Sequence, residues 1–357
     1  MKEENQNIFK GRGAQLNPKN RFDKSSYDHA NENDIDVDFY AEGKKTRYIK
    51  IHPKTIVNKV PSPDVPMEYS LNPYQGCEHG CTYCYARPTH EYWGYSAGLD
   101  FESVIMVKEN APELLRQTLM KKSWKVHPIV FSGNTDCYQP CEKKFGITRQ
   151  LLEVMLECKH PVGIITKNIL IKRDFDIVKE LAKLNLIHVH LSITTLNEEL
   201  RRNLEPRTAT SKRKLQLVKE LSEINVPVTV MAAPIIPGLS DHEILPIAKA
   251  ASENRAKQFH THVVRLMGPN ADLFENWLEI HYPNHKSKVM NQIKDIHGGK
   301  TGSSNFVERM KGQGNYSNNI GQLKKLAQAK YFPEEFKSNL NSDLFVRPSK
   351  NGQLNLF

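Results

Sequence analysis

Short apolar runs recur through the middle of the chain at intervals of roughly 25 to 40 residues, the spacing of parallel strands joined by crossover helices. The runs are residues 129–131, 162–165, 187–191, 226–230 and 262–266. Between them lie segments with apolar residues at helical spacing, which begin near the capping candidates Asn110, Thr148, Asp174 and Ser211. This alternation predicts an α/β fold, either a barrel or an open sheet, with the functional site at the carboxyl ends of the strands.

The regions that flank this repeat have a different composition. Residues 1–60 are polar and rich in charge, and we expect them to form a partly disordered N-terminal extension. The α/β core is predicted over residues 61–270. Residues 271–345 form a mixed region rich in Asn, Lys and Gly, which is expected to cover or flank the core. Residues 346–357 are predicted to be a flexible tail.

The charge balance favours an anionic partner. The chain has 50 Lys and Arg against 40 Asp and Glu, a formal charge of +10, which favours contact with a polyanion such as nucleic acid. Basic residues concentrate at Arg201, Arg202, Arg207 and 212–214, which form either a phosphate-contacting rim or a solvated helix face. The chain lacks a signal-type N-terminal segment and a run of eighteen apolar residues, so a cytoplasmic protein without membrane contact is expected.

Three of the six cysteines, Cys77, Cys81 and Cys84, lie within eight residues of one another. Thiolates suit Fe–S clusters, and three of them at this spacing can hold three irons of a four-iron cube while the fourth iron stays open. Two alternatives remain at this point. A zinc site would need His79 or His90 as a further ligand, and buried structural thiols would need a more apolar setting. Cys141 and Cys158 are interpreted as structural thiols.

Polar residues directly follow several of the apolar runs. Ser132, Gly133 and Asn134 follow the first run, Lys167 follows the second, and Ser192 and Thr194 follow the third. An apolar strip at 233–238, which includes Ile235 and Pro237, follows the fourth run and is suited to lie against a flat base. Each signal taken alone is typical of a turn, and Lys167 alone of a solvated lysine. Their joint occurrence behind a cysteine triplet favours a shared ligand site.

Cys77-x3-Cys81-x2-Cys84, with the aromatic Tyr83 before the last cysteine, resembles the signature of the radical S-adenosylmethionine (SAM) enzymes. The stretch 70–87 is similar to the branch that includes the spore photoproduct lyases, as are Thr166-Lys167, 191–193, 205–208 and 233–237. The similarity spans about residues 65–270. It implies a partial (β/α)6, TIM-like barrel with N- and C-terminal extensions.

The resemblance also implies the cofactors and their contacts. The three cysteines would ligate a 4Fe–4S cluster, and SAM would bind the open iron and be cleaved to a 5′-deoxyadenosyl radical. Electrons would come from a ferredoxin or flavodoxin. Cofactor contacts are implied for Tyr83, for Lys167, Ser192 and Thr194 near the SAM carboxylate and ribose, and for Ile235 and Pro237 near the adenine. Ser132, Gly133 and Asn134 replace the Gly-Gly-Glu strand that usually binds the SAM amino group, so the amine contact departs from the family pattern.

The same resemblance bears on the reaction. Lyases of the spore type use a cysteine near the end of the second strand as a hydrogen donor. Asn134 occupies that place here, so Cys137 is either a displaced donor or a structural thiol. The leading hypothesis is a lyase-like, hydrogen-abstracting enzyme that acts on damaged or modified DNA. Alternatives are radical modification of RNA or protein, and a non-enzymatic Fe–S electron-transfer or sensor protein recruited to DNA.

The sequence Gln353-Leu354-Asn355-Leu356-Phe357 resembles the pentapeptide by which bacterial polymerases and repair proteins dock into the DNA sliding clamp. Apolar residues in a polar tail need a partner surface, and a flexible peptide with apolar anchors is one way to supply it. The sequence therefore predicts the clamp as a partner, with packing of the tail onto its own domain as the alternative.

Overall fold

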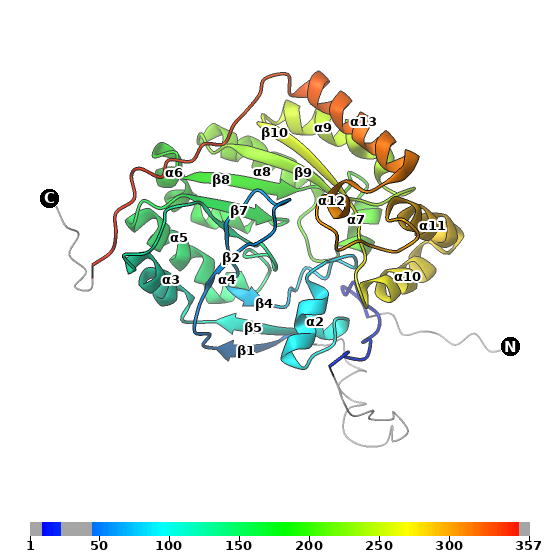
Figure 1. The fold of residues 1–357 in the computed structure, drawn as a ribbon, viewed down its shortest axis with the longest axis horizontal. Helices are drawn as coiled ribbons and strands as arrows, with labels where there is room; N and C mark the ends of the chain where they lie inside the picture. The colour runs from blue at the N-terminus through cyan, green and yellow to red at the C-terminus, as the bar shows by residue number, and fades with distance from the viewer. Residues whose placement is uncertain (1–8, 23–44, 350–357) are drawn as a thin grey trace, which may run out of the picture.

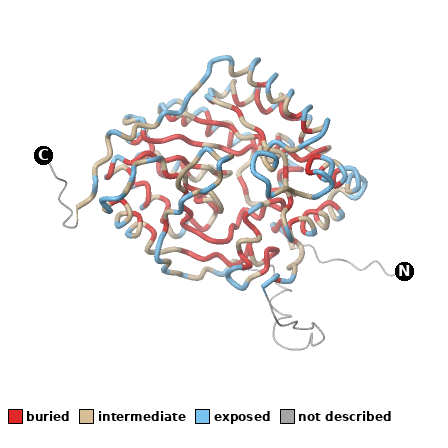
Figure 2. Tube along the Cα trace, viewed as in Figure 1, coloured by how far each residue is buried: buried red, intermediate tan, exposed pale blue. Residues whose placement is uncertain are grey.

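The computed structural model describes residues 9–22 and 45–349, and its main element is a largely parallel sheet (Figure 1). Within these residues the sheet has the order β10-β9-β8-β7-β6-β3-β2. Its strands are β2 (Val57–Lys59), β3 (Tyr69–Leu71), β6 (Ile129–Phe131), β7 (Val162–Thr166), β8 (Ile187–Ser192), β9 (Val228–Ile235) and β10 (Gln258–Val263). Figure 2 shows that the central strands are mostly buried, whereas the edge strands β2 and β10 are more exposed.

Six of the described strands, from β10 to β3, run parallel to their neighbours, and β2 pairs antiparallel to β3. Each parallel strand lies beside the one that precedes it among these six, which is the winding of a barrel rather than of a doubly wound sheet. Within the described part, β10 and β2 do not pair, so the sheet remains open. The predicted α/β class with a partial barrel of six parallel strands is confirmed.

The helices between the strands cover one face of this sheet with apolar side chains. They are α3 (Ala111–Met120), α4 (Glu142–Phe145), α5 (Ile147–Glu157), η2 (Leu170–Asp174), α6 (Phe175–Lys183), α7 (Glu198–Leu204), α8 (Ser211–Glu223), η3 (Asp241–Glu243) and α9 (Ile244–Glu253). Alternate strand residues such as Val189, Leu191 and Val230 join them in one buried core. The N-cap of α8 is Thr210, whose hydroxyl accepts from the amide of Arg213, and not Ser211 as the sequence indicated.

Two of the predicted strands are displaced along the chain. β9 begins at Val228 and β10 begins at Gln258, four residues before the apolar run at 262–266. β10 alternates Phe259 and Thr261, which are buried, with His260 and His262, which are partly buried. Because polar residues fill every second position, no continuous apolar run marks the start of this strand.

The N-terminal region contributes more structure than its composition indicated. β1 (Arg47–Ile51) pairs with β5 (Val104–Lys108), which also pairs with β4 (Tyr74–Gln75), and together they form a three-stranded sheet within the described residues. The segment 9–22 packs beside α2 (Leu99–Ser103) and η1 (Arg87–Trp93). Two strands, β1 and β2, therefore lie within the segment 1–60 that was expected to be a partly disordered extension. For residues 1–8 and 23–44, which the structure does not describe, disorder stays a prediction.

The C-terminal region contributes helices and a final extended segment. The helices are α10 (Asn270–His281), η4 (Pro283–His285), α11 (Lys286–Ile296), α12 (Glu308–Lys311) and α13 (Gly314–Tyr331). Apolar residues of α10 and α11 pack against Cys81, Tyr83 and Ile236, so this region covers the side of the sheet that carries the cysteines.

Residues 332–349, the C-terminal strap, then cross the amino ends of the strands (Figure 1). Ser338 is hydrogen-bonded to His188 at 2.6 Å, and Val346 donates to the carbonyl of Cys158 at 2.9 Å. The strap therefore lies at the opposite ends of the strands from the residues expected to form the site. Across the described residues, no helix combines the length and the apolarity needed to cross a lipid bilayer.

Candidate functional site

The segment that carries the three cysteines follows β4 and is fixed through its backbone. Cys77 donates its amide to the carbonyl of Phe101 at 2.8 Å, and Thr82 donates to Leu204 at 3.2 Å. Gly80 has φ +66°, and a Cβ at this position would lie 2.6 Å from Glu102 Oε2. The turn therefore requires glycine, because a side chain would meet both backbone strain and a buried carboxylate.

A buried ion pair holds the cysteine segment in place. Arg87 and Glu102 are both 0% exposed and form a salt bridge. Arg87 Nε also donates to the carbonyl of Cys81 at 2.9 Å, and Glu102 accepts from the amides of Gly13 at 3.0 Å and Ala14 at 2.8 Å. The pair is thus fully hydrogen-bonded, as a buried pair must be to be tolerated, and it ties the cysteine segment to the N-terminal residues.

The three thiols fit an Fe–S cluster by their chemistry. Cys77, Cys81 and Cys84 are free cysteines, and burial is the main cause that raises the pKa of each thiol. The like charges of Cys81 and Cys84 raise the pKa of Cys77 further, so the three thiols interact electrostatically. Within the described residues no three His, Cys, Asp or Glu side chains converge on one metal ion. A four-iron cube does not need such convergence, because each cysteine binds a different iron.

The surroundings of His79 do not favour the zinc alternative. His79 Nδ1 lies 3.3 Å from Asp136 Oδ2, and its Nε2 lies 3.3 Å from the side-chain nitrogen of Asn168. Both ring nitrogens are therefore engaged. His90 is 0% exposed and packs against Tyr95 and Phe101, and burial lowers its pKa to about 4.

One further residue, which the sequence did not single out, borders the cysteines. Asn270, at the start of α10, donates its side-chain NH2 to the carbonyl of Cys84 at 2.8 Å. Its Oδ1 is buried and has no hydrogen-bond partner among the described residues. A buried acceptor without a partner is costly, and beside the cysteines it fits a bound cofactor that carries a donor group.

A buried charged group joins the cysteine segment to the strand ends. We call Glu205, Lys167 and Lys214 the buried triad. Lys167 Nζ lies 3.1 Å from Glu205 Oε1, and Lys214 Nζ lies 3.6 Å from Glu205 Oε2. The hydroxyls of Tyr83 and Thr194 also donate to Glu205 Oε1. Since Tyr83 lies between Cys81 and Cys84, Glu205 anchors the cysteine segment to the ends of β7 and β8.

The triad carries two positive charges against one negative charge. Burial alone would raise the pKa of Glu205, but the ammonium groups of Lys167 and Lys214 hold this pKa below its usual range. Burial alone would lower the pKa of Lys167, but Glu205, Cys81 and Asp136 together raise it, whereas burial lowers the pKa of Lys214 despite Glu205. The surplus of positive charge lies beside Cys81, where it suits thiolate ligands or an anionic ligand group.

The structure places the predicted contact residues at the carboxyl ends of the strands. Ser132 follows β6 with φ +71°, and its hydroxyl accepts from the amide of Cys137 at 2.7 Å. The carbonyl of Gly133 accepts from the hydroxyl of Tyr85 at 2.6 Å. The side-chain nitrogen of Asn134 donates to Thr89 at 3.3 Å. The residues after β6 therefore contact the chain directly after the cysteine segment.

The remaining residues that were predicted to contact SAM are all buried. Ser192 ends β8, is 4% exposed, and gives its carbonyl to Lys214 at 3.1 Å. Ile235 is 0% exposed and belongs to the core, and Pro237 is buried after it. All three lie at the expected end of the sheet, and their roles in holding SAM stay predictions.

Cys137 lies inside the main core. It is 0% exposed, and its carbonyl accepts from the hydroxyl of Thr148 at 2.6 Å. Burial raises the pKa of this thiol well above its ordinary value. Cys141 and Cys158 are also buried in this core, as a structural role requires.

Replacing Cys137 by alanine tests its predicted role as a hydrogen donor. We expect Cys137→Ala to lose about 1 kcal/mol of unfolding free energy and to keep SAM cleavage, measured as 5′-deoxyadenosine. A donor role requires that the products formed from the true substrate change in this variant. Unchanged products would restrict Cys137 to packing.

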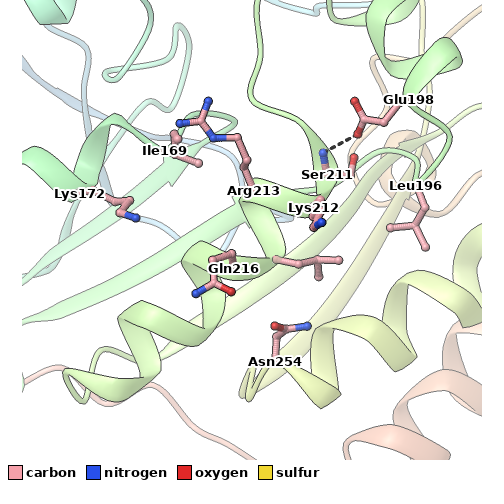
Figure 3. A pocket seen from close by; sticks show the side chains of 10 residues that line it. Ile169, Lys172, Leu196, Glu198, Ser211, Lys212, Arg213, Gln216 and Asn254 are labelled. Atoms are coloured by element: carbon pink, nitrogen blue, oxygen red, sulfur yellow. Dashed lines mark hydrogen bonds between the residues drawn. The ribbon is translucent and has the colours of Figure 1, made fainter.

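The predicted basic rim does not form as one surface. Arg201 is 8% exposed and donates to the carbonyls of Glu205 and Thr208, and Lys214 belongs to the buried triad. Lys212 and Arg213 are exposed and line a pocket of about 560 Å³ at the start of α8 (Figure 3). Periodicity along α8 explains the split, because one face of this helix must pack against the sheet.

Comparison with known proteins agrees with this arrangement. Residues 71–251 match the family model described as Radical SAM superfamily. A protein from Mycobacterium tuberculosis, named Uncharacterized protein Rv2578c, is 32% identical over 241 residues, which cover 66% of this chain and 70% of the relative. Uncharacterized protein MJ0683 from Methanocaldococcus jannaschii is 32% identical over 201 residues, which cover 56% of this chain and 72% of the relative.

Solved structures show the same fold. A spore photoproduct lyase variant with bound AdoMet and dinucleoside spore photoproduct has a TM-score of 0.59 at 12% identity, covering 82% of both chains. A spore photoproduct lyase complexed with the same dinucleoside has a TM-score of 0.58 at 13% identity, covering 80% of both chains. The family match includes all three clustered cysteines and four of the six parallel strands, β6 to β9, in full. This chain therefore belongs to the Radical SAM superfamily and is a radical SAM enzyme.

Proposed function

We propose that Cys77, Cys81 and Cys84 hold a 4Fe–4S cluster at which this enzyme cleaves SAM, and that its substrate is damaged or modified DNA. When bound and reduced, such a cluster splits SAM into methionine and a 5′-deoxyadenosyl radical that abstracts hydrogen. The protein supplies the positions of the reacting groups and a site closed to water.

The observation that carries the cluster assignment is the state of the three thiols. They are free and lie within one stretch of eight residues, while the surrounding hydrogen bonds fix the backbone of this stretch. The sulfur atoms are thus held in place without being committed to a disulfide. Buried thiols lose their protons on binding metal, so metal binding would be favoured by rising pH.

This chain's own residues prepare the site for SAM. Lys167 is held by Glu205, by Thr194 Oγ1 at 3.4 Å and by the carbonyl of Ala233 at 3.3 Å. These contacts fix the ammonium group at the strand ends, where it is suited to attract the SAM carboxylate. Asn270 Oδ1, the buried acceptor beside Cys84, is available to a donor group of the same ligand.

The choice of DNA rests on charge and on fold similarity. The chain has a formal charge of +10, which suits a phosphate backbone. A solved lyase of the same fold is complexed with a dinucleoside photoproduct. Both the positive charge and the shared fold support a reaction in which the radical abstracts hydrogen from a modified base in DNA.

Anaerobic reconstitution tests the proposal. We expect protein loaded with iron and sulfide, then reduced in the presence of SAM, to form 5′-deoxyadenosine, measured by liquid chromatography. Addition of ultraviolet-damaged DNA should raise the rate and consume a lesion, whereas undamaged DNA of the same sequence should leave it unchanged. An intact cluster without 5′-deoxyadenosine would contradict SAM cleavage, and equal rates with both DNAs would contradict the substrate.

We also propose that Gln353–Phe357 binds the bacterial sliding clamp. These residues lie outside the described part of the chain, so the support is the sequence motif together with the path of the strap. Arg347 donates to the carbonyl of Leu119 at the end of α3, which fixes the strap at the amino ends of the strands. The described part of the chain therefore ends on the side of the sheet remote from the cysteines.

A peptide of residues 348–357 should bind a purified bacterial clamp, measured by fluorescence anisotropy. The same peptide with Leu356→Ala and Phe357→Ala should lose at least about tenfold in affinity, since two buried side chains contribute more than 1.4 kcal/mol. Equal affinity of the two peptides would exclude clamp docking by this motif.

A further inference from the structure

We propose that an exposed surface formed by Lys19, Arg21, Phe22, Arg47, Tyr92 and Trp93 binds a single-stranded nucleic acid. We call it the stacking surface. The inference rests on the proposed nucleic-acid substrate and specifies which face of the protein would hold the strand and in which form.

Large aromatic side chains are unusually exposed at this surface. Tyr92 is 71% exposed, Phe22 is 49% exposed and Trp93 is 46% exposed. The rings of Phe22 and Tyr92 lie 4.9 Å apart although the residues are 70 positions apart in the chain. Neighbouring aromatic rings with open faces are what unpaired bases stack on in proteins that bind single strands.

Buried hydrogen bonds hold the two chain segments of the stacking surface together. Asn20 is 5% exposed and donates its side-chain NH2 to the carbonyl of Glu91 at 2.9 Å and to that of Tyr95 at 3.3 Å. These bonds attach the segment before Phe22 to the end of η1. Because the two backbones are fixed together, the rings present a preformed surface, and binding a strand would order few additional groups.

Positive charge is interleaved with the rings. The guanidinium of Arg21 lies 4.8 Å from the ring centre of Phe22 and 5.5 Å from that of Tyr92. Arg21 also pairs with Glu91 at 3.1 Å, but that carboxylate is 2% exposed and presents little negative charge to a ligand. Arg47 lies 5.8 Å from the ring centre of Tyr95, and Lys19 is exposed nearby in sequence. Arginine beside aromatic rings serves both base stacking and phosphate attraction.

The stacking surface is connected to the candidate site by a short piece of chain. η1 begins at Arg87, three residues after Cys84, and ends at Trp93. Tyr85 lies between Cys84 and Arg87 and is 49% exposed. Its hydroxyl donates a hydrogen bond to the carbonyl of Gly133, which follows β6. The rings of Tyr92 and Trp93 therefore stand at the far end of the helix that follows the cysteine segment. Unpaired bases are required, because a duplex hides the faces of its bases from a stacking ring.

Binding is tested with the full-length protein and a fluorescently labelled oligo(dT) of twelve nucleotides by anisotropy. Tyr92→Ala should weaken the affinity by about tenfold or more, the effect expected for loss of one stacked base. Arg21→Gln should reduce the slope of log affinity against log salt by about one phosphate contact. Phe306→Ala and Leu326→Ala remove side chains that are 52% and 50% exposed in the C-terminal helical region, and as matched controls they should bind like the wild type.

Tryptophan fluorescence gives a second, local measurement. Oligo(dT) should quench the emission of the wild type, and Trp93→Phe should lose this quenching, because Trp277 is 1% exposed and Trp124 is only partly exposed. The proposal is overturned if Tyr92→Ala binds as tightly as the wild type, if quenching persists in Trp93→Phe, or if duplex DNA binds as tightly as the single strand. These measurements require neither SAM nor a cluster, so their failure is distinguishable from failure to form 5′-deoxyadenosine.

Discussion

Glutamine in place of Glu205 is expected to lower the unfolding free energy by about 3–5 kcal/mol, the usual effect of removing one partner from a buried ion pair. Glu205 and Lys214 are 0% exposed and Lys167 is 16% exposed by side chain, so the two ammonium groups would lose their counter-ion without gaining water. The measurement is urea-induced unfolding followed by circular dichroism. An unfolding free energy within about 1 kcal/mol of the wild type would contradict the role of the triad.

The double variant Glu205→Gln with Lys214→Met separates charge from packing. The wild-type triad has a net charge of +1, Glu205→Gln has +2, and the double variant returns to +1 because only Lys167 remains charged. We expect it to recover part of the lost stability, since an uncompensated buried charge is the larger penalty. No recovery would show that the hydrogen bonds of Glu205, and not its charge, dominate.

A matched control distinguishes general destabilisation from an effect on the cysteines. Asp174 is also 0% exposed, and it binds the hydroxyl of Tyr138 at 3.0 Å and the guanidinium groups of Arg149 and Arg173. Asp174→Asn should therefore destabilise the fold through a comparable network. Only Glu205→Gln removes the negative charge that faces Tyr83 and Lys167 beside the cysteine segment, so only this variant should alter the electron paramagnetic resonance spectrum of the reduced cluster and weaken SAM binding.

Alanine in place of Cys81 is expected to abolish SAM cleavage and to lower the iron content of anaerobically purified protein. The loss should exceed the roughly 10–100-fold typical of removing a partner outside the ligand shell, because the variant removes a ligand itself. Iron and sulfide per chain and 5′-deoxyadenosine formation are the measurements. Cys77→Ala and Cys84→Ala should behave alike, since each thiolate would bind a different iron.

Cys158→Ala is the matched control for the cysteine variants. This thiol is 1% exposed and lies in the main core, where its carbonyl accepts from the amide of Val346. The variant should retain iron and SAM cleavage. Retention of both by Cys81→Ala, or purification of the wild type with zinc and without iron, would contradict the proposed ligand set.

Local sequence patterns predicted most of the α/β core. The apolar runs at 129–131 and 162–165 lie within β6 and β7, because buried parallel strands are apolar on both faces. The run at 187–191 lies within β8, where Ile187, Val189 and Leu191 alternate with two histidines. β10 was misplaced since Gln258, His260, Thr261 and His262 leave Phe259 as its only apolar residue before Val263. The N-terminal strands β1 and β2 were missed because five and three residues of mixed polarity give no usable period.

The candidate site was also predicted only in part from the sequence. The spacing of Cys77, Cys81 and Cys84 is a property of the chain itself, since ligands a few residues apart remain neighbours in most local conformations. Lys214 was assigned to a basic surface from its neighbours Lys212 and Arg213, yet it is 0% exposed and faces Glu205. A helical period turns Lys214 away from Lys212 and onto the face of Leu217, Val218 and Leu221, and that signal could have corrected the assignment.

By itself the sequence determined the family, the cysteine segment and the winding of strands and helices, because each depends on residues close together in the chain. Only the tertiary structure decided which distant residues meet. It joined Tyr83 to Glu205, Lys167 and Thr194, and it placed Phe22 beside Tyr92. Such contacts depend on the packing of whole elements, and single charges or rings carry no local pattern that specifies their partners.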